Sequence, residues 1–195
     1  MEEMFEFRLH GRGGQGIVVA ASIFAEAVFL DGYYARAFSL FGAERRGAPV
    51  TAFIRAGKNR LMPRSRIYNP DYIVVFDSSL NMDTSMAGLK EGGTLLINSG
   101  EEDSGDLVIN TEVDANFKVY TVNATGIAWK HNLAVGSFPM VNTVMLGAMG
   151  AISGLASLDS LVISIKKRVT AKLDANISAA AEGYDSVKEV ERLVT

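Results

Sequence analysis

The stretch His10–Ile17, with the sequence HGRGGQGI, lies between a predicted strand and a predicted helix. Before it, Phe5, Phe7 and Leu9 alternate with polar residues, which is the period of a half-buried strand. After it, apolar residues recur at helical spacing from Ile17 to Leu30, and no proline interrupts them. Glycines adopt positive φ easily, so the turn can approach a neighbour closely and point the first N–H groups of the helix outward, toward an anion.

One interpretation of this turn is a dinucleotide-binding site. Residues 11–16 fit the spacing Gly-x-Gly-x-x-Gly in the required strand–turn–helix context. That site also needs an acidic residue after the second strand, to hold a ribose hydroxyl, and none follows the predicted strand Tyr33–Phe38. Asp31 and Glu44 lie on either side of this strand and are poor substitutes.

The glycine turn has two other interpretations, a phosphate-binding P-loop and a turn that only packs. The spacing of Gly11 and Gly16 half-fits a phosphate-binding P-loop, but Ile17 and Val18 stand where lysine and serine or threonine are needed, which excludes a P-loop. The other is a tight turn that only packs the helix against the strand and binds no ligand. Contact with an anion or another ligand and simple packing both stay open on the sequence.

The composition predicts a globular protein. The chain has 195 residues, 48% hydrophobic and 21% charged, and we expect one domain over residues 1–195. No apolar run approaches a membrane span and the N-terminus shows no signal-peptide pattern, so a cytoplasmic location is expected. Cysteine is absent, which excludes disulfides, a thiolate nucleophile and a cysteine-ligated cluster, and two histidines make a histidine metal site improbable.

Charge is distributed unevenly along the chain. Residues 1–66 carry ten Lys/Arg and six Asp/Glu, whereas the remainder carries nine and sixteen, for a net charge of −3. Eight of these cations lie between Arg36 and Arg66, with Glu44 as the one acid, so this segment forms either a solvated surface or a face toward an anionic ligand or acidic partner. The pI of about 5.5 argues against a dedicated nucleic-acid binder.

Strand and helix patterns alternate along the rest of the chain. Further strands are predicted at residues 33–38, 50–55, 72–76, 94–98 and 118–122, with a hairpin return around residues 61–62 and at most a short strand at 107–109. Helices are predicted at residues 82–90, 123–133, 142–152, 160–168 and 173–194. This alternation predicts an α/β fold, a Rossmann-like three-layer arrangement with an open, mainly parallel sheet and helices on both faces.

A few polar positions have local interpretations. Asp77-Ser78-Ser79 follows a buried strand, where ligands bind in parallel sheets, but we favour a role in helix capping, by Ser79 or Asn81. Asp159 is predicted to cap the helix at 160–168, and Trp129 and His131 are predicted to be packing and surface residues. Gly183, within the last predicted helix, indicates close helix packing.

Five motifs occur in a fixed order along the chain: HGRGGQG at 10–16, FGAERRGAP at 41–49, NPDYIVVFD at 69–77, Asn142 with Leu146-Gly147-Ala148, and Asn176-x-x-Ala179-x-x-x-Gly183-Tyr184. With them the chain resembles, nearly end to end, the gamma subunit of the 2-oxoacid:ferredoxin oxidoreductases, the pyruvate synthase family. The form GAERRGAP is similar to members that act on pyruvate.

The resemblance implies a multi-subunit enzyme that oxidatively decarboxylates a 2-oxoacid and transfers the acyl group to coenzyme A. Thiamine diphosphate and iron–sulfur clusters, which pass electrons to ferredoxin, would lie on partner subunits of the alpha, beta and delta type, and no cofactor would reside in this chain. The chain would dock to these partners and contact coenzyme A at a shared site. It would be inactive alone, with no catalytic residue and no metal, and whether it then forms a homodimer stays open.

The candidate contact residues follow from the two glycine-bearing loops. The turn residues expected to contact coenzyme A, another anion or a partner subunit are Gly11, Arg12, Gly13, Gly14, Gln15 and Gly16. Glu44 with Arg45 or Arg46 is expected to form intersubunit salt bridges. The alternatives are a stand-alone dinucleotide-binding domain, enzyme or sensor, and a scaffold that binds only sibling subunits.

Overall fold

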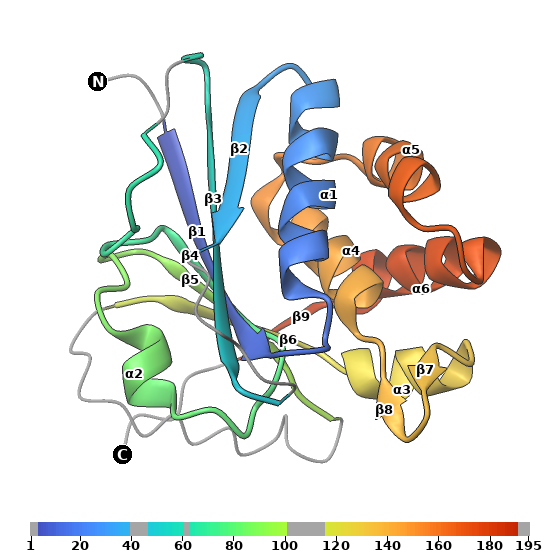
Figure 1. The fold of residues 1–195 in the computed structure, drawn as a ribbon. Helices are drawn as coiled ribbons and strands as arrows, with labels where there is room; N and C mark the ends of the chain where they lie inside the picture. The colour runs from blue at the N-terminus through green and yellow to red at the C-terminus, as the bar shows by residue number, and fades with distance from the viewer. Residues whose placement is uncertain (1–3, 40–46, 61–62, 101–115, 191–195) are drawn as a thin grey trace.

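The structure is a computed structural model, which describes residues 4–39, 47–60, 63–100 and 116–190 (Figure 1). The elements in these ranges are, in chain order, β1 (Met4–Arg12), α1 (Ile17–Leu30), β2 (Tyr34–Ser39), β3 (Pro49–Gly57), β4 (Tyr72–Val75), α2 (Met82–Met86), β5 (Thr94–Asn98), β6 (Lys118–Val122), α3 (Ala124–Lys130), β7 (Ala134–Val135), β8 (Phe138–Pro139), α4 (Asn142–Ser153), α5 (Leu158–Arg168), α6 (Leu173–Ser186) and β9 (Lys188–Val190). The expectations for residues 61–62 and 107–109 lie outside the described residues.

The main sheet of the described residues has seven strands in the order β2-β3-β1-β4-β5-β6-β9. Strands β1, β4, β5 and β6 pair in parallel, while β3 runs antiparallel between β1 and β2. β9 pairs antiparallel with β6 at the far edge. Five strands therefore run in one direction and β3 and β9 oppose them, which confirms the predicted α/β fold with a mostly parallel sheet.

Helices cover both faces of the sheet, but unequally. α1, α3, α4, α5 and α6 lie on one face and the five-residue α2 lies on the other (Figure 1). The larger hydrophobic cluster fills the first face, where Phe7, Leu9 and Phe24 are fully buried. A smaller cluster, which includes Ile73 and Met86, lies under α2. On β1 and β3, Arg8, Phe53 and Arg55 are buried but belong to neither cluster.

Glycines let α4 and α6 approach each other closely. A Cβ atom added at Gly147 would overlap the backbone carbonyl oxygen of Ala180, and one added at Gly183 would overlap that of Val144. The two helix backbones are thus in direct contact, which larger side chains would prevent. The predicted close packing at Gly183 is confirmed.

The end of the last predicted helix was wrong. α6 ends at Ser186, and Lys188–Val190 forms β9 instead of continuing the helix toward residue 194. Valines at helical spacing suggested continuation, but the edge of β6 offers unpaired backbone groups that this segment satisfies. The Tyr120 hydroxyl also donates to the Glu189 carboxylate at 2.9 Å.

Two further boundaries differ from the prediction. The helix expected at 82–90 ends at Met86, because the chain turns at Gly88, which has a φ of 80°. The cap of α5 is Ser157, not Asp159: the Ser157 hydroxyl accepts from the Ser160 N–H at 3.2 Å. In both cases the local sequence allows two structures, and contacts with neighbouring segments decide between them.

Candidate functional site

The glycine turn joins β1 to α1, as predicted, and its geometry requires glycine. Gly14 has a φ of 98° and Gly16, the residue before the helix, has a φ of 77°. A Cβ atom on Gly16 would come within 2.8 Å of the Asn142 side-chain nitrogen, at the start of α4. The turn therefore allows the close packing of α1 against the start of α4, whether or not it also binds a ligand.

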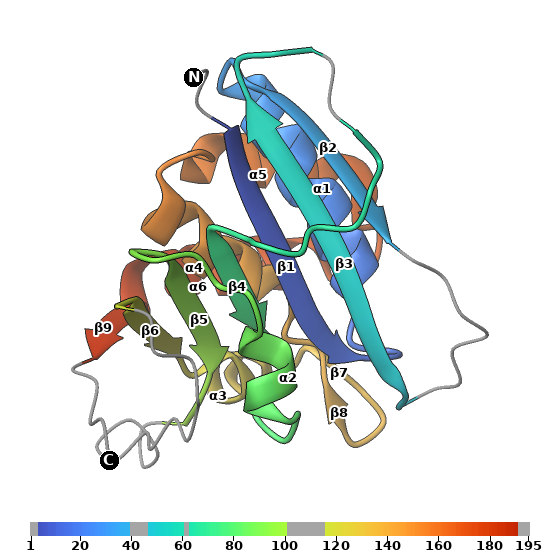
Figure 2. The ribbon, with the colours of Figure 1, turned by 90° about the vertical axis from the view of Figure 1, so that its left-hand side faces the viewer.

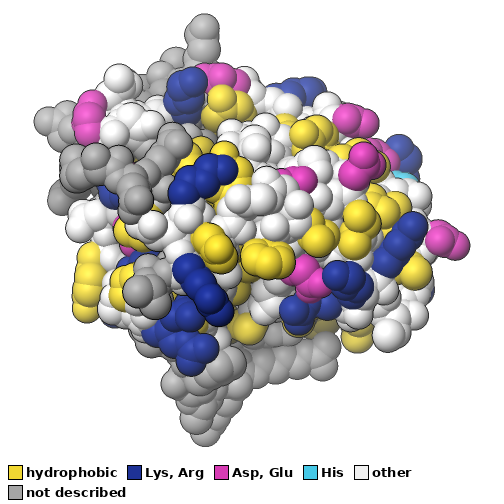
Figure 3. Space-filling model, turned by 90° about the horizontal axis from the view of Figure 1, so that it is seen from above, with side chains coloured by type: hydrophobic (Ala, Val, Ile, Leu, Met, Phe, Trp, Pro, Cys, Tyr) yellow, Lys and Arg dark blue, Asp and Glu magenta, His cyan; other side chains and the backbone are white. Residues whose placement is uncertain are grey.

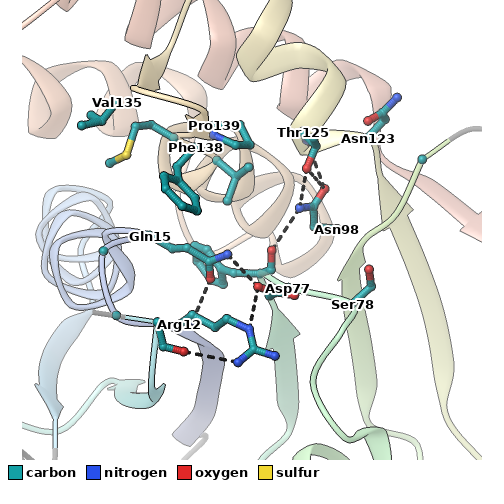
Figure 4. Close-up of a pocket in the computed structure, with 17 residues that line it drawn as sticks. Arg12, Gln15, Asp77, Ser78, Asn98, Asn123, Thr125, Val135, Phe138 and Pro139 are labelled. Carbon is teal, nitrogen blue, oxygen red and sulfur yellow. Dashed lines mark hydrogen bonds and ion pairs between the residues drawn. The ribbon is translucent and has the colours of Figure 1, made fainter. Parts of the chain in front are cut away.

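A cavity of about 890 Å³ opens beside this turn, at the carboxyl ends of the parallel strands (Figure 4). Ligands of open parallel sheets bind at this edge. Its lining combines backbone from the glycine turn, polar side chains that follow β4, β5 and β6, and apolar side chains near α4. The lining residues are Arg12, Gly13, Gly14, Gln15, Gly47, Phe76, Asp77, Ser78, Asn98, Gly100, Asn123, Thr125, Val135, Phe138, Pro139, Met140 and Val141.

Arg12 is held at the edge of this cavity by three partners. Its Nε donates to the Asp77 carboxylate at 3.1 Å, one terminal nitrogen donates to the Ser79 hydroxyl at 2.9 Å, and the other to the Gly47 carbonyl at 3.3 Å. Gln15 also donates to the Asp77 carboxylate, at 3.0 Å, and accepts from the Arg12 N–H at 2.7 Å (Figure 4). The guanidinium is thus oriented, and its charge is balanced by Asp77.

Asp77 stays ionised in this arrangement. Partial burial acts to raise the pKa of its carboxyl group, but hydrogen bonds from Ser79 and Gln15 and the charge of Arg12 outweigh burial and hold the pKa below its ordinary value. A carboxylate in this state competes with any external anion for Arg12. An anionic ligand would bind by taking over part of the guanidinium's coordination.

The far wall of the cavity is set by Asn98 and a short hairpin. Asn98 donates to the Phe76 carbonyl and to the Thr125 hydroxyl, both at 3.0 Å, and so ties β4 and β5 to the start of α3. The β7–β8 hairpin brings Val135 and Phe138 to the cavity although both are largely exposed (Figure 4). Sequence reasoning missed this hairpin, whose signal was a glycine and a serine between two apolar pairs.

The structure separates the predicted turn residues into two groups. Arg12, Gly13, Gly14 and Gln15 line the cavity, whereas Gly11 and Gly16 do not. The added Cβ tests place Gly11 against Ile17 and Gln15, and Gly16 against Asn142, so both have packing roles. Glu44, Arg45 and Arg46 lie outside the described residues.

The predicted helix cap after Asp77 is confirmed at Asn81, while Asp77 and Ser79 have another role. The favoured interpretation of Asp77-Ser78-Ser79 was helix capping, and Asn81 does cap α2, accepting from the Thr84 N–H at 2.9 Å. Asp77 and Ser79 instead hold Arg12, across 65 and 67 residues of sequence. Only the adjacency of β1 and β4 in the sheet brings these groups together.

The topology does not favour the dinucleotide-binding alternative. In that fold the second strand lies beside the first, so that its terminal acid faces the glycine turn. Here β3 separates β1 from β2. Asp31, one of the two substitute acids, binds the start of α5 instead, accepting from the Ser157 N–H at 2.6 Å and from the Ser160 hydroxyl at 2.7 Å.

The described cations of the segment at residues 36–66 do not share one environment. Arg55 is buried and its Nε donates to the Glu6 carboxylate at 2.7 Å, whereas Lys58 lies over the Tyr33 ring, 3.6 Å from its centroid. On the face of the molecule seen in Figure 3, Lys and Arg side chains are interspersed with acidic and hydrophobic ones. Arg12 is the one cation among the described residues that line the cavity.

Neither a metal-ligand cluster nor a membrane-spanning helix is found in the described ranges. No group of three or more histidine, cysteine or acidic side chains in these ranges is arranged to hold a metal ion. None of the helices described is both long and apolar enough to cross a membrane.

Comparison with known proteins shows the family. Residues 6–186 match the pyruvate ferredoxin/flavodoxin oxidoreductase family. The chain is 46% identical over 187 residues to pyruvate synthase subunit PorC of Methanothermobacter marburgensis, covering 95% of this chain and 98% of that one. It is 43% identical over 185 residues to the common subunit gamma of the pyruvate/ketoisovalerate oxidoreductases of Thermococcus kodakarensis, covering 93% and 96%.

A solved structure agrees with these relatives. The crystal structure of pyruvate oxidoreductase subunit PORC from Thermotoga maritima superposes with a TM-score of 0.82 at 35% identity, over 97% of this chain and 100% of that one. The chain belongs to the pyruvate ferredoxin/flavodoxin oxidoreductase family, as a gamma subunit, which confirms the resemblance carried by its motifs.

Proposed function

We propose that this chain acts within a multi-subunit 2-oxoacid:ferredoxin oxidoreductase, where it docks to partner subunits and contributes one wall of a coenzyme A site. The partners would be alpha-, beta- and delta-type subunits that carry thiamine diphosphate and iron–sulfur clusters, and ferredoxin would accept electrons from them. The chain has no cysteine with which to ligate a cluster. Its own contribution would be binding and positioning.

The observation that carries the coenzyme A proposal is the oriented Arg12 guanidinium beside a cavity of about 890 Å³ with an apolar far wall. Coenzyme A combines phosphates with a long, largely neutral chain and, when bound, supplies the thiol that accepts the acyl group. Arg12 and the backbone of Gly13 and Gly14 would hold a phosphate. Val135 and Phe138 would pack on the neutral part and exclude water from it.

The test is Arg12→Ala in the purified complex. Loss of a charge-assisted hydrogen bond of about 1.5–3 kcal/mol should raise the KM for coenzyme A about tenfold or more, with kcat nearly unchanged. Arg64→Ala is the matched control, because Arg64 is exposed and does not line this cavity. An unchanged KM in the Arg12→Ala complex would overturn the contact.

We further propose that Glu44 with Arg45 or Arg46 forms salt bridges to a partner subunit. A charged triplet between two glycines suits a contact surface rather than a core. Arg45→Ala should weaken retention of the chain in the complex, as measured by co-purification with a tagged partner. Full retention of the unaltered chain in the complex at raised salt would contradict these salt bridges.

Pyruvate is the substrate we favour, with the choice of oxoacid made by the partner subunits. The Thermococcus kodakarensis relative is named as common to pyruvate and ketoisovalerate oxidoreductases, so one gamma subunit serves two substrates there. Exchange of partner subunits around this chain should change the preferred oxoacid. A cytoplasmic location stays a prediction, testable by fractionation, and light scattering would decide whether the isolated chain forms a homodimer.

A further inference from the structure

We propose that a second cavity, on the sheet face that carries α2, binds an acidic segment of a partner subunit. This cavity, called the cationic groove, has a volume of about 760 Å³ and includes Arg8, His10, Arg66, Tyr68, Asn69 and Asn81 in its lining. It lies across β1 from the helix-covered face and is separate from the cavity beside Arg12. The inference rests on the proposed function, because it requires a partner subunit.

The groove is positively charged. Arg8 and Arg66 line it, and no aspartate or glutamate is among its described lining residues. Glu6 and Asp71, two acids near the groove, have cations of their own: Glu6 accepts from Arg55 at 2.7 Å, and Asp71 accepts from Lys90 at 2.9 Å. Asp83 on α2 is exposed, and no ion pair among the described residues joins a carboxylate to Arg8 or Arg66.

Arg8 is the buried source of this charge, being 6% exposed. Its Nε donates to His10 Nε2 at 3.0 Å, and its terminal nitrogens donate to the backbone carbonyls of Tyr68, Ser85 and Ala87. These carbonyl dipoles satisfy the guanidinium donors but do not cancel a unit charge. No ion pair to Arg8 occurs among the described residues.

The imidazole of His10 lies in the same positive environment. Burial, with the charges of Arg8 and Arg66, lowers the pKa of its imidazole to about 3. Because Nε2 accepts the hydrogen bond from Arg8, the neutral ring carries its proton on Nδ1. The ring therefore adds a neutral donor to the groove and no negative charge.

A protein segment fits this groove better than a free anion. The donors of Arg8 are committed to backbone carbonyls, so the groove lacks the dense set of free donors that a small ion needs. Arg66 is exposed and lies over the ring of Tyr68, which is 69% exposed, 5.5 Å from its centroid. Arginine and tyrosine are the side chains most enriched at the centres of protein interfaces.

The shape of this region supports an extended occupant. The connection from β3 to β4 crosses in front of β3 and β1, and α2 lies beside β4 (Figure 2). The lining of the groove comes from residues 66–69 of this connection, from residues 80–88 and from residues 49–51 at the start of β3. A chain segment with aspartate or glutamate could lie along it, with a carboxylate on Arg66 and an apolar contact on Tyr68.

The first test is charge reversal in the co-expressed complex. Arg66→Glu should lower retention of the chain by a tagged partner subunit at least tenfold, because it places a like charge against the acidic segment. Arg64→Glu is the matched control: it makes the same change on an exposed arginine two residues away that does not line the groove, and should leave retention unchanged.

The second test is a photo-crosslinking amino acid at position 68 in the same complex. We expect capture of a partner-subunit peptide that contains aspartate or glutamate. Equal retention of the two charge reversals, capture of a second copy of this chain, or an Arg66-dependent rise in the Tm of the isolated chain in citrate without any crosslink would overturn the proposal. If the unaltered chain is retained by no partner, the proposed function fails first and this inference falls with it.

Discussion

Arg8 and Arg12 lie four residues apart on β1, and their guanidinium groups have different kinds of partner. Arg12, at the carboxyl end of the strand, is partly exposed and paired with the Asp77 carboxylate. Arg8, near the middle, is buried and bonded to His10 and backbone carbonyls. The difference teaches that the position on the strand decides whether a cation is paired with a carboxylate, as Arg12 is, or held by neutral groups alone among the described residues, as Arg8 is.

The largest expected effect is that of removing Arg8. Arg8→Met removes the donor to the carbonyls of Tyr68, Ser85 and Ala87, of which the Ser85 bond is buried, and should lower the free energy of unfolding by about 3 kcal/mol or more. Arg12→Met removes a partly exposed pair and should lower it by about 1 kcal/mol or less. Urea unfolding at pH 7 measures both. Equal losses would abolish the distinction between the two arginines.

The pH dependence of stability sharpens the same comparison through His10. Its folded-state pKa of about 3 lies below the unfolded value of 6.5, so between these pH values the unfolded chain binds a proton that the folded chain does not. Stability should therefore fall as the pH falls, by about 1 kcal/mol per pH unit between pH 6 and 4. The His10→Gln variant lacks this titration. The difference in unfolding free energy between the unaltered chain and the variant therefore separates the contribution of His10 from that of the carboxylates. A pH-independent difference would contradict the buried, neutral imidazole.

The smallest effect concerns the turn that presents Arg12. Gly16→Ala and Gly32→Ala both force a non-glycine residue to positive φ, at 77° and 88°. Only Gly16 also has a neighbour, Asn142, within reach of the added Cβ. Gly16→Ala should thus be about 1 kcal/mol more destabilising than Gly32→Ala in urea unfolding. Equal destabilisation would show that α4 moves away from the turn without cost.

Local patterns predicted the first half of the site well. The alternation of Phe5, Phe7 and Leu9 and the helical spacing after Ile17 placed the glycine turn between β1 and α1, and Arg12, Gly13, Gly14 and Gln15 do line a cavity. The partner of Arg12 was not predictable in the same way. Asp77 lies 65 residues away, and its local context predicted the helix cap that follows it but not its contact with Arg12.

The remaining errors share a physical cause. Valines after Ser186 have helical spacing, but pairing with β6 outweighs that weak preference. β3 enters the sheet between β1 and β2 although nothing in its own residues specifies which neighbour it pairs with. Strand order and edge pairing depend on contacts between segments far apart in sequence, which periodicity within a window does not contain.

The sequence by itself determined the family, the α/β class and the strand–turn–helix that carries Arg12, because these depend on local period, glycine positions and motifs in order. Only the tertiary structure decided that Arg12 is neutralised by Asp77 while Arg8 is not neutralised by any carboxylate among the described residues. The physical reason is that charge balance depends on distance in space. The order of strands in the sheet sets that distance, and residues on one strand do not specify their neighbours.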